Sequence, residues 1–120
     1  MKKEIYSTIS KFYPFKSLDS FALTYHSIND FNHNFTPELY QLKLDSFFEQ
    51  IRFLKNQNIK STDHIEDLFN PTRKCILTFD DGYKNNLEIV GPLLKSLNVP
   101  FSVFLSTHHI NSGERFPTFL

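Results

Sequence analysis

Short apolar runs alternate along the chain with longer stretches of helical period. Residues 21–25 (FALTY), 76–79 (ILTF) and 99–105 (VPFSVFL) have the composition of strands covered on both faces. Residues 46–58 and 83–97 place their apolar side chains on one stripe, as in a helix that packs against a sheet. The order strand, helix, strand, helix, strand predicts an α/β fold with parallel strands and right-handed crossovers.

Local signals predict where the helices begin and bend. Asp45 or Ser46 is a candidate N-cap for the first helix, and Ser46 with Glu49 has the spacing of a capping box. This helix is expected to end near Asn58. The Gly91-Pro92 pair predicts a kink in the helix over 83–97. A further short helix is expected over 62–69, with three apolar side chains facing inward: Ile65, Leu68 and Phe69.

Composition and charge narrow the class of protein. The 120 residues suffice for a single domain, and the apolar fraction of 40% allows a packed core. Thirteen basic residues balance thirteen acidic ones, so no strong positive field favours nucleic acid. No apolar run has the length of a signal peptide or a membrane span, which predicts a cytoplasmic protein. The single cysteine, Cys75, lies in an apolar run and is expected to be a buried thiol.

Two adjacent carboxylates follow the most apolar predicted strand. Asp80 and Asp81 come directly after residues 76–79 and are followed by Gly82, which allows a tight turn. Adjacent carboxylates repel each other, and a bound cation would relieve this repulsion. A divalent metal could also lower the pKa of a bound water and so generate a nucleophile. An acidic turn without catalytic function is the alternative interpretation of these three residues.

The longer run over 76–107, ILTFDDGYKNNLEIVGPLLKSLNVPFSVFLST, resembles the first motif of the polysaccharide deacetylase (NodB homology) family. Together with FALTYHSI and FFEQIRFLK upstream, the resemblance spans roughly residues 21–107. It implies a partial (β/α) barrel and a hydrolase that removes N-acetyl groups from a glycan. It further implies that Asp80 is the general base and that Asp81 is a ligand of a divalent metal, with zinc as the first candidate.

The chain departs from the family pattern after residue 105. The second family motif, two histidines separated by three residues, is absent, and the adjacent pair His108 and His109 is better explained as solvated loop residues. We therefore expect residues 1–120 to be the N-terminal part of one deacetylase domain, truncated before that motif and inactive by itself. The alternative is a non-catalytic fragment that associates with itself or with a complementing fragment.

Two further residues are candidates for contact with the substrate. His26 follows the first predicted strand and would reach the same barrel end as Asp80, although a histidine hydrogen-bonded at a strand end explains it equally well. The ring of Tyr83 could line a sugar site or simply pack at the start of a helix. A phosphate-binding or response-regulator-like domain is a third interpretation, which the placement of the lysines in helices and loops disfavours.

Overall fold

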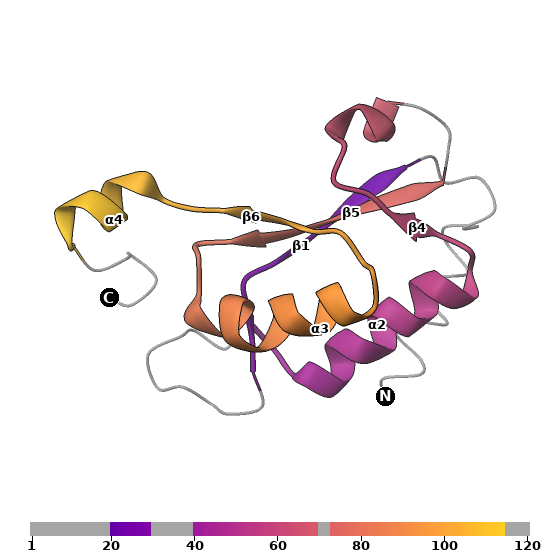
Figure 1. The fold of residues 1–120 in the computed structure, drawn as a ribbon, viewed down its shortest axis with the longest axis horizontal. Coiled ribbons are helices and arrows are strands. Elements are labelled where there is room, and N and C mark those ends of the chain that lie inside the picture. Colours follow the sequence, from indigo (N-terminus) through magenta and orange to yellow (C-terminus); the bar gives the residue numbers. More distant parts are fainter. Residues whose placement is uncertain (1–19, 30–39, 70–72, 115–120) are drawn as a thin grey trace.

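One parallel sheet organises the chain. The computed structural model describes residues 20–29, 40–69 and 73–114. The central strand β5 (Lys74–Asp80) pairs in parallel with β1 (Phe21–Tyr25) along one side. Along its other side β5 pairs in parallel with β4 (Lys60–Ser61) near its start and with β6 (Ser102–Phe104) near its end (Figure 1). The predicted parallel arrangement, with the strand 76–79 in the middle, is confirmed.

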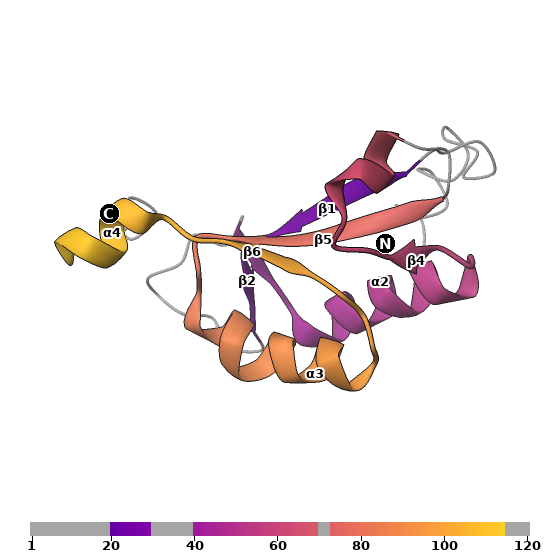
Figure 2. The same cartoon turned by 45° about the horizontal axis from the view of Figure 1, so that its top comes forward.

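Helices cover the two faces of this sheet unequally. Helices α2 (Leu44–Asn56) and α3 (Gly91–Ser96) lie on one face, and the short 3₁₀ helix η3 (Ile65–Phe69) lies on the other (Figure 2). Helix α4 (Thr107–Ser112) follows β6 and projects beyond the end of the sheet (Figure 1). A two-stranded parallel sheet, β2 (Ser27–Ile28) with β3 (Gln41–Leu42), continues from β1. No helix among the described residues is long and apolar enough to cross a membrane.

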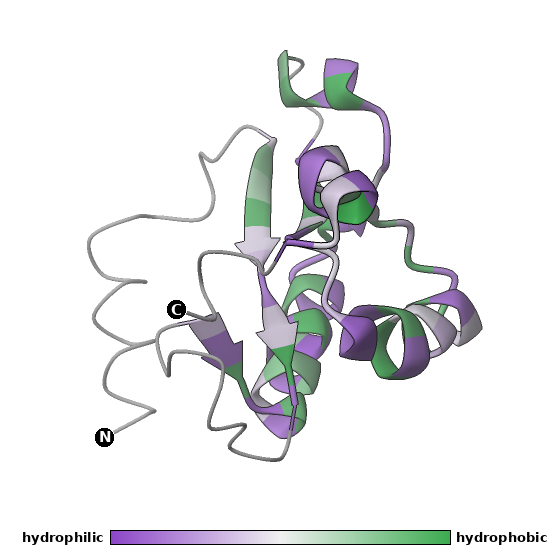
Figure 3. Cartoon of the chain, turned by 90° about the vertical axis from the view of Figure 1, so that its left-hand side faces the viewer, coloured by the Kyte–Doolittle hydropathy of each residue, from purple (hydrophilic) through white to green (hydrophobic). Residues whose placement is uncertain are grey.

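The core fills the space between the sheet and helices α2 and α3. The rings of Tyr25, Phe47 and Phe79 meet there at centroid distances of 5.1 to 6.0 Å. Phe101 adds an edge-on contact to Phe79 at 5.7 Å. Hydrophobic and hydrophilic positions alternate around the helices, as one-sided packing requires (Figure 3). Cys75 is fully buried in this core, as the sequence predicts.

Two details of the helices differ from expectation. Helix α2 begins at Leu44 with Lys43 as N-cap and no side-chain capping bond, so the predicted capping box of Ser46 and Glu49 is wrong. Both residues lie inside the helix. In η3, Ile65 and Phe69 are exposed and are not part of the packed core.

The predicted kink at Gly91-Pro92 takes the form of a π-helical turn. Proline has no N–H to donate, so an α-helix cannot run through it without losing a bond. The chain forms the π-helix η4 (Asn86–Val90), and the Gly91 N–H donates to the carbonyl of Asn86. Helix α3 then starts at Gly91 with Pro92 in its first turn, where no donor is required.

Candidate active site

The two carboxylates sit on a tight turn at the carboxyl end of β5. Asp80 is the last residue of the strand, and Asp81 adopts φ 71°, followed by Gly82 at φ 66°. A left-handed conformation at a residue with a Cβ costs roughly 1–2 kcal/mol. Such conformations cluster at functional sites, where the surrounding structure holds them in place. The turn therefore directs Asp81 off the line of the strand at an energetic cost.

Gly82 brings this turn against the end of β6. A Cβ built on Gly82 would lie 2.6 Å from Cδ2 of Leu105. The positive φ and the close approach both favour glycine at this position. The turn after β5 and the segment after β6 are thereby held together at one end of the sheet.

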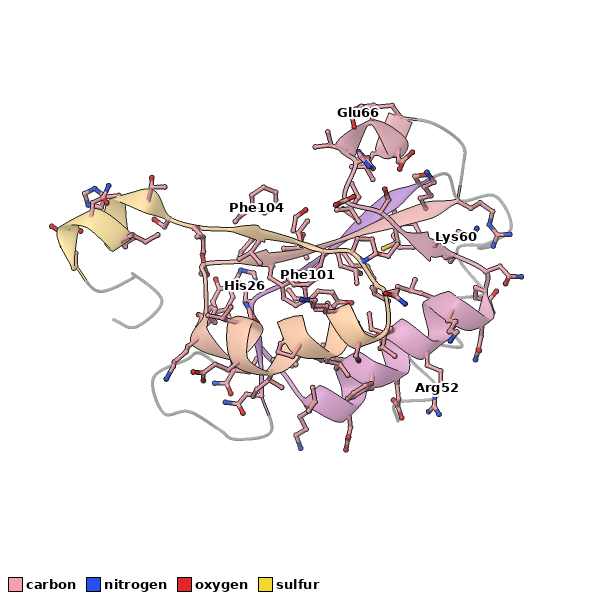
Figure 4. The ribbon with its side chains drawn as sticks, viewed as in Figure 1. His26, Arg52, Lys60, Glu66, Phe101 and Phe104 are labelled. Atoms are coloured by element: carbon pink, nitrogen blue, oxygen red, sulfur yellow. The ribbon has the colours of Figure 1, made fainter. Side chains whose placement is uncertain are left out.

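A pocket of about 570 Å³ lies on the sheet face that α2 and α3 leave uncovered. Its walls come from alternate residues of three neighbouring strands, from η3, and from the segments that follow β5 and β6. The lining residues are Ala22, Thr24, Asp63, Ile65, Leu68, Ile76, Thr78, Asp80, Asp81, Ser102, Phe104, Leu105 and Ser106. Asp80 and Asp81 thus border one cavity. Phe104, paired in register with Asp80, points to this face, whereas Phe101 points toward α3 (Figure 4).

A row of hydroxyl groups crosses the floor of the pocket. The strand register sets Thr24 beside Thr78 and Thr78 beside Ser102. The Thr78 hydroxyl lies 3.0 Å from that of Thr24 and 3.4 Å from the carbonyl of Leu23. Because residues alternate between the two sides of a strand, this row lies on the same face as Asp80. A strip of three hydroxyl groups therefore crosses an otherwise largely apolar pocket beneath the carboxylates, and a hydrogen bond joins two of them, those of Thr24 and Thr78.

An ion pair joins η3, which lines the pocket, to the start of β5. Lys74 donates to both carboxylate oxygens of Asp67 at 2.9 Å, and the Thr62 hydroxyl donates to the same group at 2.6 Å. The hydrogen bond from Thr62, followed by the one from Lys74, lowers the pKa of Asp67. These bonds connect the 3₁₀ helix to the start of β5.

His26 approaches Asp81 from the end of β1. Its Nε2 atom lies 3.8 Å from Oδ2 of Asp81, and its ring meets that of Tyr40 at a centroid distance of 4.7 Å. The His26 and Asp81 side chains are only 27% and 19% exposed. Burial raises the pKa of the Asp81 carboxyl; the adjacent Asp80 raises it as well, whereas His26 opposes the shift. The Asp81 carboxylate is therefore less solvated than an ordinary surface carboxylate, and one imidazole lies beside it.

His108, His109 and the candidate tyrosine lie elsewhere. His108 and His109 are on α4, and Nε2 of His108 lies 3.1 Å from a carboxylate oxygen of Glu114 in an exposed contact. Tyr83 is half-buried and does not line the pocket. The structure therefore places Asp80 and Asp81 on the pocket with His26 beside Asp81, whereas neither His26 nor Tyr83 lines the pocket itself.

The described residues do not make a complete catalytic metal site. Asp81 and His26 supply a carboxylate and an imidazole, both common metal ligands, and the incompletely solvated carboxylate suits a cation. Catalytic zinc sites use about three protein ligands. In the described parts of the chain, no group of three or more His, Cys, Asp or Glu side chains could hold a metal ion.

Two asparagines that the sequence patterns did not single out contact the loop that carries His26. The Asn86 side chain donates to the His26 carbonyl at 2.9 Å, and the Asn85 side chain donates to the Ser27 hydroxyl at 2.8 Å. Both lie just after the Asp80-Asp81-Gly82 turn. Asparagine near a helix start is common, so only the fold reveals these contacts with a distant segment.

A family model described as polysaccharide deacetylase matches residues 69–116. This range contains β5, the carboxylate turn, η4, α3 and β6. No curated protein matches the sequence of the chain. The segment that matches the family model, residues 69–116, includes the two carboxylates of the candidate site.

Solved structures of deacetylases share the fold. A de-N-acetylase from Aggregatibacter actinomycetemcomitans is 19% identical with a TM-score of 0.65, covering 82% of this chain and 42% of its own. A polysaccharide deacetylase from Bacillus cereus is 22% identical with a TM-score of 0.58, covering 80% and 37%. A Bacillus anthracis structure described as a polysaccharide deacetylase is 20% identical with a TM-score of 0.63, covering 79% and 32%.

The chain thus spans less than half the length of these structures, and at such identities the likeness shows the fold alone. Residues 69–116 match the polysaccharide deacetylase family model, and the parallel strands are arranged as in the solved deacetylases. The chain is therefore similar to a segment of the polysaccharide deacetylase family and folds as part of a NodB-type (β/α) barrel.

Proposed function

We propose that this chain supplies the first part of the active site of a polysaccharide deacetylase, a hydrolase that removes acetyl groups from the amino groups of an N-acetylated glycan. The observation that carries the proposal is the placement of Asp80 and Asp81 on one pocket at the carboxyl end of the central strand. Ligands of parallel α/β folds bind at that end of the sheet. The family match over residues 69–116 supports the substrate class.

In this proposal Asp80 is the general base. Hydrolysis of an acetamide adds a water oxygen to the carbonyl carbon, breaks the carbon–nitrogen bond and leaves a free amine and acetate. A base within hydrogen-bond reach must take the proton from the attacking water. Asp80 lines the pocket and is the candidate for this base. Asp81, beside His26, has a carboxylate of low exposure and takes the second role.

That second role is to bind a divalent metal ion, with zinc as the first candidate. Asp81 and His26 would supply at most two ligands, so the rest must come from outside the described residues. The group that protonates the leaving amine must likewise come from elsewhere.

A second candidate function is a non-catalytic piece that associates with another polypeptide. The specific observation in its favour is the incomplete ligand set among the described residues. The two candidates differ in what they require of Asp81: a metal-binding role needs its carboxylate, whereas a purely associating fragment does not.

Metal retention and acetate release test whether the site of this chain is incomplete. The purified 120-residue protein would be loaded with zinc, dialysed, analysed for metal and incubated with chitin oligosaccharides. We expect no tightly held zinc and no acetate above the buffer control, because about three protein ligands are needed. The opposite result would be one equivalent of retained zinc together with acetate release, both lost in Asp81→Ala and kept in Glu114→Gln. This result would show that the metal site is complete and that the chain is an active enzyme.

A further inference from the structure

His26 lies between β1 and the two-residue strand β2, and β2 pairs only with the equally short β3 among the described residues. A strand of two residues contributes little to holding a side chain in place. Some other element must therefore fix the backbone at His26.

The π-helical turn η4 supplies that support. Asn86, its first residue, is 2% exposed and donates its side-chain amide to the His26 carbonyl at 2.9 Å. Asn85 donates to the buried Ser27 hydroxyl at 2.8 Å. Two successive side chains thus bond to two successive residues of the loop.

The π turn is itself tied to the carboxylate turn. The backbone N–H of Asn86 donates to the carbonyl of Tyr83 at 3.0 Å, directly after Gly82. The carbonyl of Asn86 accepts from Gly91, where an added Cβ would lie only 3.2 Å from that oxygen. Such π turns occur frequently at functional sites. One short segment therefore connects the backbone after Asp81 to the backbone at His26.

The hydrogen-bonding state of these asparagines fits a role beyond stability. The side-chain oxygens of Asn85 and Asn86 are buried and have no hydrogen-bond partner among residues 20–29, 40–69 and 73–114. A buried unpaired oxygen costs about 1–3 kcal/mol, which an apolar residue of similar shape would avoid. Asparagine nevertheless occupies both positions.

We propose that Asn86, assisted by Asn85, is a positioning residue that holds His26 against Asp81. The inference rests on the proposed function, because it gives His26 a purpose only if Asp81 is part of the site. The bond from Asn86 sets the backbone of His26, and the ring then lies between Tyr40 and Asp81. Neither asparagine touches the pocket, so neither is a catalytic residue.

The test reads the position of the His26 ring directly by NMR. In the native protein, nuclear Overhauser effects (NOEs) should connect the rings of His26 and Tyr40, whose centroids are 4.7 Å apart. In Asn86→Leu, which keeps the size and removes the donor, and in Asn86→Ala, we expect most of that intensity to be lost. NOEs between Tyr25 and Phe47, 5.1 Å apart in the core, should persist and report an intact fold.

Three further variants separate positioning from general stability. Leu54→Ala removes a buried side chain of α2 and should lower stability while keeping the His26–Tyr40 signal. Asn56→Ala, at an exposed position, should change neither. Ser27→Ala removes the acceptor of Asn85 without altering the helix, and should weaken the signal even if the Asn86 variants fail to fold.

Retention of the full His26–Tyr40 signal in every folded Asn86 and Ser27 variant would overturn the inference. The readout involves no activity, so an inactive protein leaves it intact. Conversely, an Asp81-dependent deacetylase whose His26 ring is unmoved by these variants would keep the proposed function and eliminate the positioning role.

Discussion

The Asp81 carboxylate and the His26 imidazole lie 3.8 Å apart at the ends of two neighbouring parallel strands. The register of β1 against β5 produces this proximity, because Tyr25 pairs with Phe79 and the next residues of both strands emerge together. Parallel pairing therefore brings the end of one segment, with its histidine, beside the carboxylate turn of another. The π-helical turn then connects the two backbones.

Substitution of Gly82 should destabilise the fold mainly through its backbone angle. At φ 66° a residue with a Cβ is strained, and we expect Gly82→Ala to lower the free energy of unfolding by roughly 1–2 kcal/mol. The new Cβ would also meet Leu105, but that side chain is exposed and can rotate away. Urea unfolding of Gly82→Ala, Leu105→Ala and the double variant measures both effects. If the cost vanished in the Leu105→Ala background, the contact and not the angle would be its cause.

Alkaline pH should weaken the fold through Cys75. Burial raises the pKa of this thiol to about 12, whereas in the unfolded chain it ionises near pH 8.5. The unfolded state therefore loses its proton first, and the stability contributed below that pH is lost as the pH rises toward 12. The free energy of unfolding relative to Cys75→Ala should fall by up to about 1.4 kcal/mol per pH unit in this window. A difference independent of pH between 8 and 11 would show that the thiol is not desolvated.

The open edge of β6 predicts self-association of the isolated chain. Within the described residues β6 pairs only with β5, and Val103, Phe104 and Leu105 at its end are all exposed. Unpaired edges with apolar side chains favour pairing with another chain, and a lysine on the edge opposes it. Sedimentation velocity should show concentration-dependent association that Val103→Lys reduces and the exposed control Leu87→Lys does not. A monomer at all concentrations would contradict this prediction.

Much of the fold could be predicted because it depends on local composition. The run over 76–79 is the most apolar of the predicted strands, and it forms part of the central strand β5. Inward placement of Ile65 and Phe69 could not be predicted correctly, since apolar period shows which residues share a face but not whether another element covers it. Helix α2 begins before Ser46 because tertiary packing of its apolar stripe outweighs a capping signal of about 1 kcal/mol.

In the candidate site, too, some residues could be predicted from the sequence and others could not. The sequence pointed to Asp80, Asp81 and His26 because all three follow predicted strands, and the structure brings them together, while their chemical roles stay predictions. It gave no signal for Asn86, whose contact joins segments distant in sequence through a side chain that no local pattern distinguishes. Tyr83 shared the sequence neighbourhood of the site but not its pocket, because the turn at Asp81 and Gly82 redirects the chain.

Paramagnetic NMR with Mn²⁺ tests most directly whether Asp81 faces a metal. Manganese accepts carboxylate and imidazole ligands and broadens the signals of nearby nuclei. We predict weak binding at millimolar Mn²⁺ that broadens the resonances of Asp81, Gly82 and His26 first, that Asp81→Asn abolishes, and that Glu114→Gln leaves unchanged. Broadening centred on other acidic residues, or unaffected by Asp81→Asn, would contradict the assignment of this turn as the metal-binding part of a deacetylase site.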